Sequence, residues 1–469
     1  MKRYEILAQE VAQSIAAGQL RPGDRVPSVR ETSRNRGVSP STVFEAFYLL
    51  EAQGLIEARP RSGYFVRQGT SKPAEPAASS PAAEVREVEV SELVFQVLGY
   101  SRNRAMVPLG SAFPSPDLFP LPKLALALGK AVRRLDPWKT VEDLSPGSAE
   151  LRRQIALRYL GAGCPIDTDE LVITNGAMEA LNLCLESVTR PGDLVAVESP
   201  TFYGALQALE RHSLKAVEVA THPRTGVDIA ALAAVLERHP VKACWLMPNF
   251  QNPLGSLMPD AAKQQLVALL AHHQVPLIED DVYGELYFGT HKPKPAKSWD
   301  YTGLVMHCSS FSKTLAPGFR VGWVAAGRFA TTVGRRKLMS SLAAPVPSQE
   351  GLSEYLQHGG YDRHLRQLRQ ALLRHRQIVL RGVAKWFPSG TRVTQPEGGY
   401  FVWIELPQSV DALELHRLAL SQEISLAPGH LFSTDRRYRN HVRINFGHPD
   451  DVRTETALKT IGQMAKALG

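Results

Sequence analysis

The sequence has few cysteines and no long apolar run. Its four cysteines, at positions 164, 184, 244 and 308, lie far apart and form no CxxC pair. A disulfide-stapled scaffold is therefore not expected, and we predict no metal site. No stretch of about 18 uncharged apolar residues occurs, and charges stand where a signal peptide would have its apolar segment. We expect a cytoplasmic protein that is neither secreted nor inserted into a membrane.

A strong charge imbalance is also absent. The 469 residues include 54 Lys+Arg and 46 Asp+Glu, which leaves a formal net charge of +8. An excess this small does not by itself indicate a nucleic-acid partner. The apolar share of 44% is enough to build hydrophobic cores, and the length predicts roughly two to four domains.

One segment lacks large apolar side chains altogether. Residues 69–84 contain eleven Ala, Pro or Ser among sixteen positions, so they cannot bury a core of their own. We interpret residues 69–104 as a linker between a small unit at 1–68 and a larger unit at 105–469.

The N-terminal unit has the pattern of three helices followed by a two-stranded wing. Ser28 and Glu31 have the spacing of a capping box at the start of the second helix. Ser39 as N-cap, followed by proline, predicts the third helix. The segments LIEA at 55–58 and YFV at 64–66, on either side of a basic tip at 59–63, predict the wing.

The C-terminal unit alternates short apolar strands with amphipathic helices, which predicts a parallel or mixed sheet covered by helices on both faces. From about residue 346 to 469 the pattern changes, and a long helical stretch precedes GGYFVWIEL and HVRINFG, which predicts a smaller α+β lobe. The strands predicted for the main sheet are LVIT at 171, LVAVES at 194, KAVEV at 215, KACWLMP at 242, VPLIED at 275, LVMHCSS at 304 and RVGWVAA at 320.

The segment SSFSKTLAPGFR at 309–320 lies between two predicted strands. Lys313 is therefore expected at the sheet edge where α/β proteins bind ligands, with hydroxyls beside it and Arg320 seven residues further on. A lysine beside a phosphate cradle suggests pyridoxal 5′-phosphate as the cofactor. Taken alone, an exposed lysine in a polar loop is the simpler interpretation, so the rest of the chain must decide.

Three further segments supply groups that suit this cofactor. Asp280 ends an apolar strand and Tyr283 follows it, so a carboxylate could keep the pyridine nitrogen protonated while a phenol bonds the ring's O3′. Asn252 in an NPLG turn offers an amide to the same oxygen. Gly176 precedes a helix whose free N–H groups could bind phosphate. Each feature alone also has a structural explanation as a cap, a turn or a helix start.

In this order, the segments resemble the fold-type I pyridoxal-phosphate enzymes of the aspartate aminotransferase kind, over roughly residues 105–469. The resemblance implies that Lys313 attaches the cofactor, that Asp280 faces the pyridine nitrogen, and that Asn252 and Tyr283 hold O3′. It also implies that Arg443 receives a substrate α-carboxylate, although a solvated strand arginine would fit the same pattern. The other implied contacts are Gly176, Ala177, Met178, Ser310, Ser312 and Arg320 at the phosphate, and Phe202, or its neighbour Tyr203, stacked on the ring.

The sequence departs from that family near Gly147. The family's YxDPxGxxxLR segment has a tyrosine that reaches the phosphate of the neighbouring subunit, whereas residues 142–152 here read EDLSPGSAELR. The sequence does not identify a residue that replaces this tyrosine.

The N-terminal unit resembles GntR-type winged helix-turn-helix domains over residues 1–68. Hydroxyls at the start of a recognition helix, with arginines nearby, suit the phosphates and base edges of DNA. Many such domains have an arginine where Pro40 stands here. The resemblance rests on LRPGDRVPSVR at 20–30, GVS at 37–39, STV at 41–43, GLI at 54–56 and SGYFV at 62–66. The candidate DNA contacts are Arg30, Ser39, Ser41, Thr42, Arg61 and Gly63, each of which could instead be a helix cap or an ordinary surface residue.

Both resemblances in one chain are typical of the MocR group of bacterial transcription regulators. We expect an α+β winged helix-turn-helix followed by an α/β three-layer large domain of fold type I with a smaller α+β lobe. The resemblance implies a sequence-specific DNA-binding regulator that binds pyridoxal 5′-phosphate, senses an amino compound or the cofactor itself, and forms a homodimer, typically head to tail. The alternative is an active aminotransferase with an accessory DNA-binding domain, because the residues needed for transamination are present.

Overall fold

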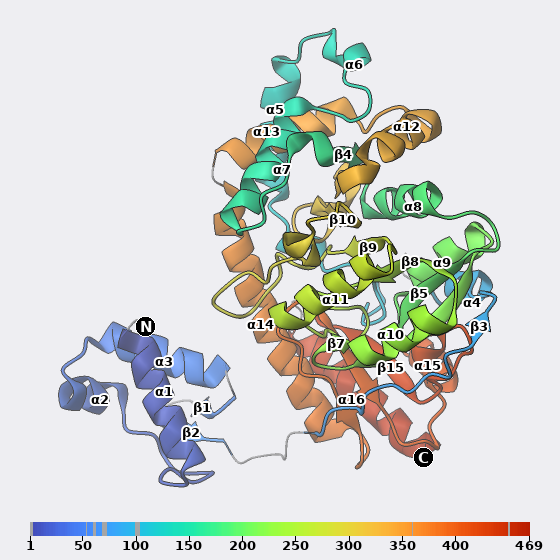
Figure 1. Cartoon of the computed structure of the whole chain (residues 1–469). Helices are drawn as coiled ribbons and strands as arrows, with labels where there is room; N and C mark the ends of the chain where they lie inside the picture. The colour runs from blue at the N-terminus through green and yellow to red at the C-terminus, as the bar shows by residue number, and fades with distance from the viewer. Residues whose placement is uncertain are drawn as a thin grey trace.

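The protein folds into a small N-terminal unit, blue in Figure 1, and a much larger body formed by the rest of the chain. The computed structural model describes residues 3–52, 54–59, 62–67, 73–98, 104–358, 360–448 and 451–469. Within these ranges, no helix is long and apolar enough to cross a membrane.

The N-terminal unit is a helix-turn-helix with a wing, as its sequence predicts. Ser28 caps the second helix by accepting a hydrogen bond from the Glu31 amide at 3.2 Å, and Gly37 ends that helix in the left-handed region. Val43 and Phe47 of the third helix are fully buried in the core of the unit. The elements are α1 (Arg3–Ala16), α2 (Val29–Arg36), α3 (Pro40–Ala52) and the antiparallel strands β1 (Ile56–Arg59) and β2 (Gly63–Val66).

The large domain is built on a mixed sheet with the order β3-β6-β5-β8-β9-β10-β11-β4. The run from β6 to β10 is parallel, whereas β11 is antiparallel to both β10 and β4. Every strand that the sequence predicts for the main sheet is present in it. The bounds are β3 (Val85–Arg86), β4 (Leu171–Thr174), β5 (Leu194–Ser199), β6 (Lys215–His222), β7 (Gly226–Val227, paired with β6), β8 (Val241–Leu246), β9 (Leu277–Asp280), β10 (Val305–Ser310) and β11 (Gly322–Ala325).

Helices cover both faces of this sheet, and a second small sheet forms the C-terminal lobe, red in Figure 1. The small sheet has the order β12-β13-β15-β14. The helices are α4 (Ser91–Leu98), α5 (Leu121–Arg133), α6 (Lys139–Glu142), α7 (Ala149–Gly161), α8 (Ala177–Val188), α9 (Tyr203–Arg211), α10 (Ile229–Arg238), α11 (Asp260–His272), α12 (Ala330–Ser341), α13 (Val346–Gln357), α14 (Gly360–Trp386), α15 (Ala412–Leu420) and α16 (Asp451–Leu468). The strands of the lobe are β12 (Arg392–Val393), β13 (Phe401–Glu405), β14 (Ala427–Pro428) and β15 (His441–Asn445).

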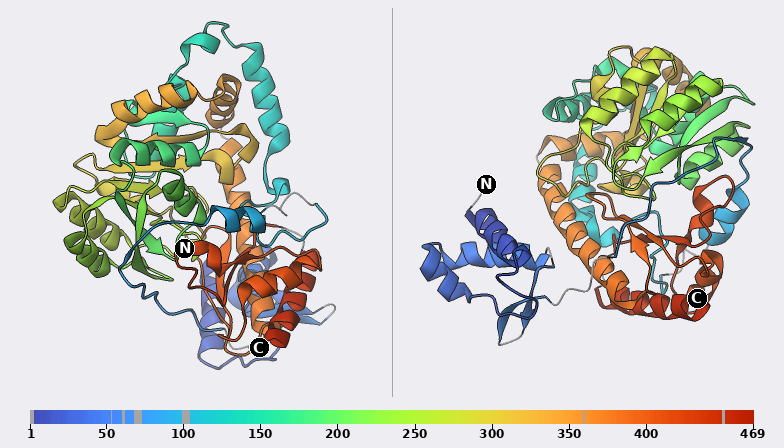
Figure 2. Two further views of the ribbon diagram at one scale, coloured as in Figure 1. Left: turned by 90° about the vertical axis from the view of Figure 1, so that its right-hand side faces the viewer. Right: turned by 60° about the horizontal axis from the view of Figure 1, so that its bottom comes forward.

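The described part of the segment expected as a linker, residues 73–98, lies on the large domain, and Figure 2 shows it as the blue chain that follows the body. The Ala74 carbonyl accepts a hydrogen bond from the Val393 amide at 2.9 Å. β3 extends the edge of the main sheet, and the Glu210 carboxylate accepts hydrogen bonds from the Val90 and Ser91 amides at the start of α4. The large body therefore begins well before residue 105.

Candidate functional site

Two predicted site residues lie at the same edge of the main sheet. Asp280 is the last residue of β9, and Lys313 follows β10 in a short 3-10 turn. These two strands are parallel, with Cys308 opposite Asp280, so both chains leave the sheet on one side. The Lys313 Nζ donates to the Ala112 carbonyl at 2.9 Å and lies 3.8 Å from the centre of the Phe113 ring.

Burial disfavours the charged form of both groups and so brings both pKa values close to 7. It lowers the pKa of Lys313 to about 7, helped by the positive charges of Arg443 and Arg320 and opposed by Asp280. It also raises the pKa of Asp280 to about 7, and the neighbouring Asp281 carboxylate adds to this rise. An amine that is partly neutral near pH 7 is a nucleophile toward aldehydes.

A cradle of free amides and a guanidinium forms where β4 turns into α8. Gly176 has a φ of +86°, and any side chain added there would collide with the Arg320 guanidinium. Arg320 Nη2 donates to the Asn175 carbonyl at 2.7 Å, which fixes the guanidinium beside the start of α8. Ala177 and Met178 are the first residues of that helix, so their amides have no partner within it.

Two serines border this cradle from the lysine turn. The Ser310 hydroxyl accepts a hydrogen bond from the Ser312 amide at 3.3 Å and so caps the turn. The buried Ser312 Oγ has no hydrogen-bond partner among the described residues. An anion in the cradle could therefore accept a hydrogen bond from Ser312 without displacing a protein contact.

Arg443 lies in β15 and is completely buried, which rules out the interpretation as a solvated strand arginine. Its Nη1 donates to Asn252 Oδ1 at 3.1 Å, and its Nη2 donates to the carbonyls of Gly110 at 2.8 Å and Ser111 at 3.1 Å. The guanidinium also lies 4.2 Å from the centre of the Phe401 ring. A buried guanidinium held only by neutral oxygens is a strong site for a carboxylate.

Nothing in the sequence indicated that residues 110–113 would lie in this site. Besides Lys313 and Arg443, Tyr400 and Asn445 also bind this segment. The Tyr400 hydroxyl donates to the Ala112 carbonyl at 3.0 Å, and Asn445 Nδ2 donates to the Ser111 and Phe113 carbonyls at 2.9 and 2.8 Å. Asn445 could have been suspected, because it lies two positions after Arg443 and so faces the same side of β15.

The aromatic residues expected at the cofactor ring surround the same corner. Tyr283 is buried with its ring 5.3 Å from Tyr400, and burial raises its pKa well above the ordinary value. Phe202 precedes α9 and is half-buried, with its ring 4.9 Å from Tyr203. The centre of the Tyr203 ring in turn lies 5.8 Å from the Arg443 guanidinium.

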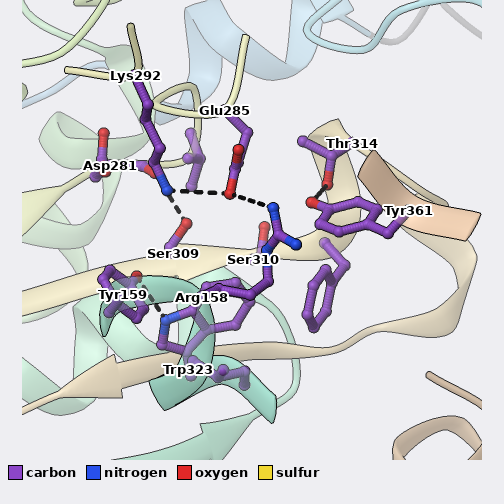
Figure 3. A pocket seen from close by; sticks show the side chains of 13 residues that line it. Arg158, Tyr159, Asp281, Glu285, Lys292, Ser309, Ser310, Thr314, Trp323 and Tyr361 are labelled. Atoms are coloured by element: carbon purple, nitrogen blue, oxygen red, sulfur yellow. Dashed lines mark hydrogen bonds and ion pairs between the residues drawn. The ribbon is translucent and has the colours of Figure 1, made fainter. Parts of the chain in front are cut away.

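A polar cluster behind the lysine turn holds that turn in place (Figure 3). The Tyr361 hydroxyl donates to Thr314 Oγ1 at 2.9 Å, and His364 Nε2 lies 2.6 Å from the Thr314 carbonyl. Arg158 stacks on the Tyr361 ring at 4.4 Å and pairs with Glu285 at 3.2 Å. A cavity of about 20 Å³ lies among these side chains, which is room for one water molecule. The turn that carries Lys313 is thus held to α14 by two hydrogen bonds at Thr314.

The DNA candidates are gathered at the start of α3. The Ser39 hydroxyl lies 2.8 Å from both the Ser41 and Thr42 hydroxyls, and it caps the helix by accepting from the Thr42 amide at 3.3 Å. Arg30 is exposed in the first turn of α2. Gly63 begins β2 with a φ of +97°, and the predicted contact Arg61 lies outside the described residues.

Comparisons with known proteins agree with both halves of this description. Residues 140–461 match the family of class I and II aminotransferases, and residues 3–66 match the bacterial regulatory proteins of the gntR family. The chain is 48% identical to the HTH-type transcriptional regulator YdcR of Escherichia coli K12, over 99% of both chains.

Solved aminotransferases share the fold of the large domain. The kynurenine aminotransferase of Pyrococcus horikoshii, solved with PMP, is 28% identical with a TM-score of 0.74, over 81% of this chain and 95% of that chain. The alpha-aminoadipate aminotransferase LysN of Thermus thermophilus, solved with N-(5′-phosphopyridoxyl)-L-leucine, is 28% identical with a TM-score of 0.73, over 81% and 96% of the two chains. The chain therefore belongs to the MocR-type transcriptional regulators, in which a gntR-family DNA-binding domain is joined to an aminotransferase class I and II domain.

Proposed function

We propose that this regulator binds pyridoxal 5′-phosphate between the ends of β9 and β10, with Lys313 as the point of covalent attachment. The observation that carries this is one buried corner with an amine and a carboxyl whose pKa values are both about 7. When bound, the cofactor supplies an electron sink conjugated to an amino group. Asp280 Oδ1 has no hydrogen-bond partner among the described residues, so a protonated ring nitrogen would satisfy it.

The other groups of the corner suit the rest of that cofactor. Asn252 Oδ1 already accepts from Arg443, which leaves the Asn252 amide N–H groups as donors to the ring oxygen, together with the Tyr283 hydroxyl. The phosphate would be held by Ser310, Ser312, Arg320 and the first amides of α8, at Ala177 and Met178, above Gly176. Phe202 would stack on the ring.

The effector we propose is an amino compound with a carboxylate that binds Arg443. In the structure the Arg443 fork is held by the carbonyls of Gly110 and Ser111, so a carboxylate must replace these contacts. Because the same segment also holds Lys313 through Ala112, a ligand that enters would loosen residues 110–113 at several points. The chain that precedes this segment leads to the DNA-binding unit. Ligand binding at Arg443 could therefore change how the DNA-binding unit is held.

We further propose a homodimer, head to tail, that presents two winged helices to two half-sites of chromosomal DNA in the cytoplasm. Binding should then be cooperative through effective concentration, and it should fall steeply with salt as phosphates are neutralised. The test is a series of binding isotherms at several salt concentrations, on the DNA upstream of the protein's own gene and on random DNA. Tighter binding to the upstream region is expected, and equal affinity for both DNAs at every salt concentration would contradict a sequence-specific regulator.

Arg30 should carry part of this salt dependence. Arg30→Ala should reduce the slope of log K against log salt by about 2, because the homodimer loses one phosphate contact at each of its two winged helices. Arg417→Ala, an exposed arginine on α15 of the large domain, is the matched control and should leave the slope unchanged.

The second candidate function is transamination, and the intact set of Lys313, Asp280 and Arg443 favours it. Steady turnover of the full chain with an amino donor and a keto acceptor would support an enzyme. DNA retention without turnover would support a regulator that only senses its ligand.

A further inference from the structure

The recognition helix has no cationic side chain. The sequence of α3 is PSTVFEAFYLLEA, which contains two glutamates and neither lysine nor arginine. The most common specific contact with DNA, an arginine or lysine fork on the O6 and N7 of guanine, therefore cannot come from this helix. Sequence must be read by its hydroxyls or by its apolar side chains.

The exposed side of α3 carries two large aromatic side chains instead. Phe44 is 54% exposed and Tyr48 is 61% exposed, whereas Val43 and Phe47 beside them are fully buried. Ser41, Phe44 and Tyr48 are spaced by three and four positions, so they form one stripe along the helix. We call Phe44 and Tyr48 the aromatic stripe of α3.

Two large apolar side chains exposed next to one another require a partner surface, because exposure to water costs both of them free energy. The stripe continues directly from Ser41 in the hydroxyl cluster at the start of the helix, so whatever binds the hydroxyls also covers Phe44. On α2, Arg30 and Arg34 are exposed, and neither forms an ion pair with another described side chain. The partner of this face is therefore polyanionic and yet has apolar groups.

The major groove of DNA has one apolar group that distinguishes bases, the 5-methyl group of thymine. We propose that the aromatic stripe reads thymine methyl groups, with Phe44, one turn from the hydroxyl cluster, as the main contact. This inference rests on the proposed DNA-binding function and adds the chemistry of base selection to it. The phosphates would be held by the arginines of α2, and the sequence preference would come from an apolar contact.

Thymine and uracil differ only by this methyl group, so the test replaces one by the other. A duplex is first recovered from a random library by repeated selection on the full-length, cofactor-loaded protein, and each thymine is then replaced in turn by deoxyuridine. Replacement at one or two positions per half-site should weaken binding about fourfold, which corresponds to the ~0.8 kcal/mol of one buried methyl group. Phe44→Ala should weaken binding to the thymine duplex and bind both duplexes equally.

Two control variants make the outcome decisive. Phe44→Leu keeps an apolar side chain and should keep a preference for thymine, while Phe95→Ala removes an aromatic residue that is 71% exposed on α4 and should change nothing. A Phe44→Ala protein that folds, as checked by its thermal midpoint, and still prefers thymine over uracil as the unmodified protein does would overturn the proposal, and so would a selected duplex in which no thymine methyl matters. Recovery of no preferred sequence would instead overturn the proposed function and this inference together.

Discussion

Asp280 and Glu285 are five positions apart in the chain, yet their surroundings differ completely. Glu285 lies between Arg158 and Lys292, at 3.2 and 3.0 Å, and these cations hold its pKa at about 2 against the effect of burial. Asp280 forms no ion pair with a described side chain, and the charge of Lys313 only partly offsets burial, which raises the pKa of Asp280 to about 7. The polar cluster around Glu285 is thus electrostatically complete, whereas the corner around Asp280 lacks a directly bound positive group, which a ligand can supply.

The largest expected effect concerns Lys313, in the same corner as Asp280. Lys313→Ala should abolish covalent attachment of pyridoxal phosphate, measured as cofactor that stays on the protein after borohydride reduction. Because only the neutral amine reacts, uptake of cofactor by the apoprotein should speed up as the pH rises through about 7. Lys313→Arg, which keeps a cation, should fail equally. Covalent trapping in either variant would show that another lysine attaches the cofactor. The corner around Asp280 would then not be the cofactor site.

The next largest effect is a loss of stability and concerns Glu285 in the polar cluster. Glu285→Gln should destabilise the protein by about 3 kcal/mol at pH 7, the value of a carboxyl held near pKa 2 instead of its usual 4.3. The folded pKa is the lower one, so this stabilisation is present above the unfolded pKa and is lost as the pH falls from about 5 to 2. Urea unfolding of both proteins at several pH values measures the difference between their free energies of unfolding. A difference that does not decrease in acid would show that the ion pairs of Glu285 are not its source.

A smaller effect sharpens the assignment of Arg443. Arg443→Ala should weaken binding of amino-acid or keto-acid ligands by about 1.5–3 kcal/mol and leave cofactor in place, because a charge-assisted hydrogen-bond pair is removed. Ligand-induced changes in the cofactor spectrum report this binding. Arg439→Ala, at an arginine whose side chain is 75% exposed in the same lobe, is the matched control. Unchanged spectral shifts with both amine and acid ligands in Arg443→Ala would remove the carboxylate from the proposal.

The smallest expected effect concerns the hydrogen bond that links the polar cluster to the lysine turn. Tyr361→Phe keeps the ring that Arg158 stacks on and removes only the hydrogen bond to Thr314. A cost of about 1 kcal/mol in stability is expected, with a modest loss of cofactor affinity because the Lys313 turn is held less firmly. Loss of stability with unchanged cofactor affinity would show that this hydrogen bond does not influence the cofactor site at Lys313.

The sequence was most informative where local rules dominate. Caps such as Ser28 and Ser39, and the parallel strands that bring Asp280 and Lys313 to one edge, follow from spacing and from the geometry of α/β sheets. Residues 110–113 could not be predicted, because apart from the Phe113 ring they contribute backbone carbonyls, which every residue has. The packing of residues 73–98 on the large domain could not be predicted from the composition of the segment, because the two-residue strand β3 is stabilised by the edge of the sheet.

The docked segment that begins near Ala74 has a consequence for the operator. The last backbone contact of the winged helix is the Arg67 amide on the Leu55 carbonyl, so seven residue steps separate it from Ala74. Such a chain spans at most about 25 Å when fully extended. Each winged helix must therefore stay within this distance of its large domain, and moving one half-site by half a helical turn, which also turns it to the far side of the duplex, should weaken binding. The spacing of the half-sites, and not only their sequence, should decide which promoters this protein recognises.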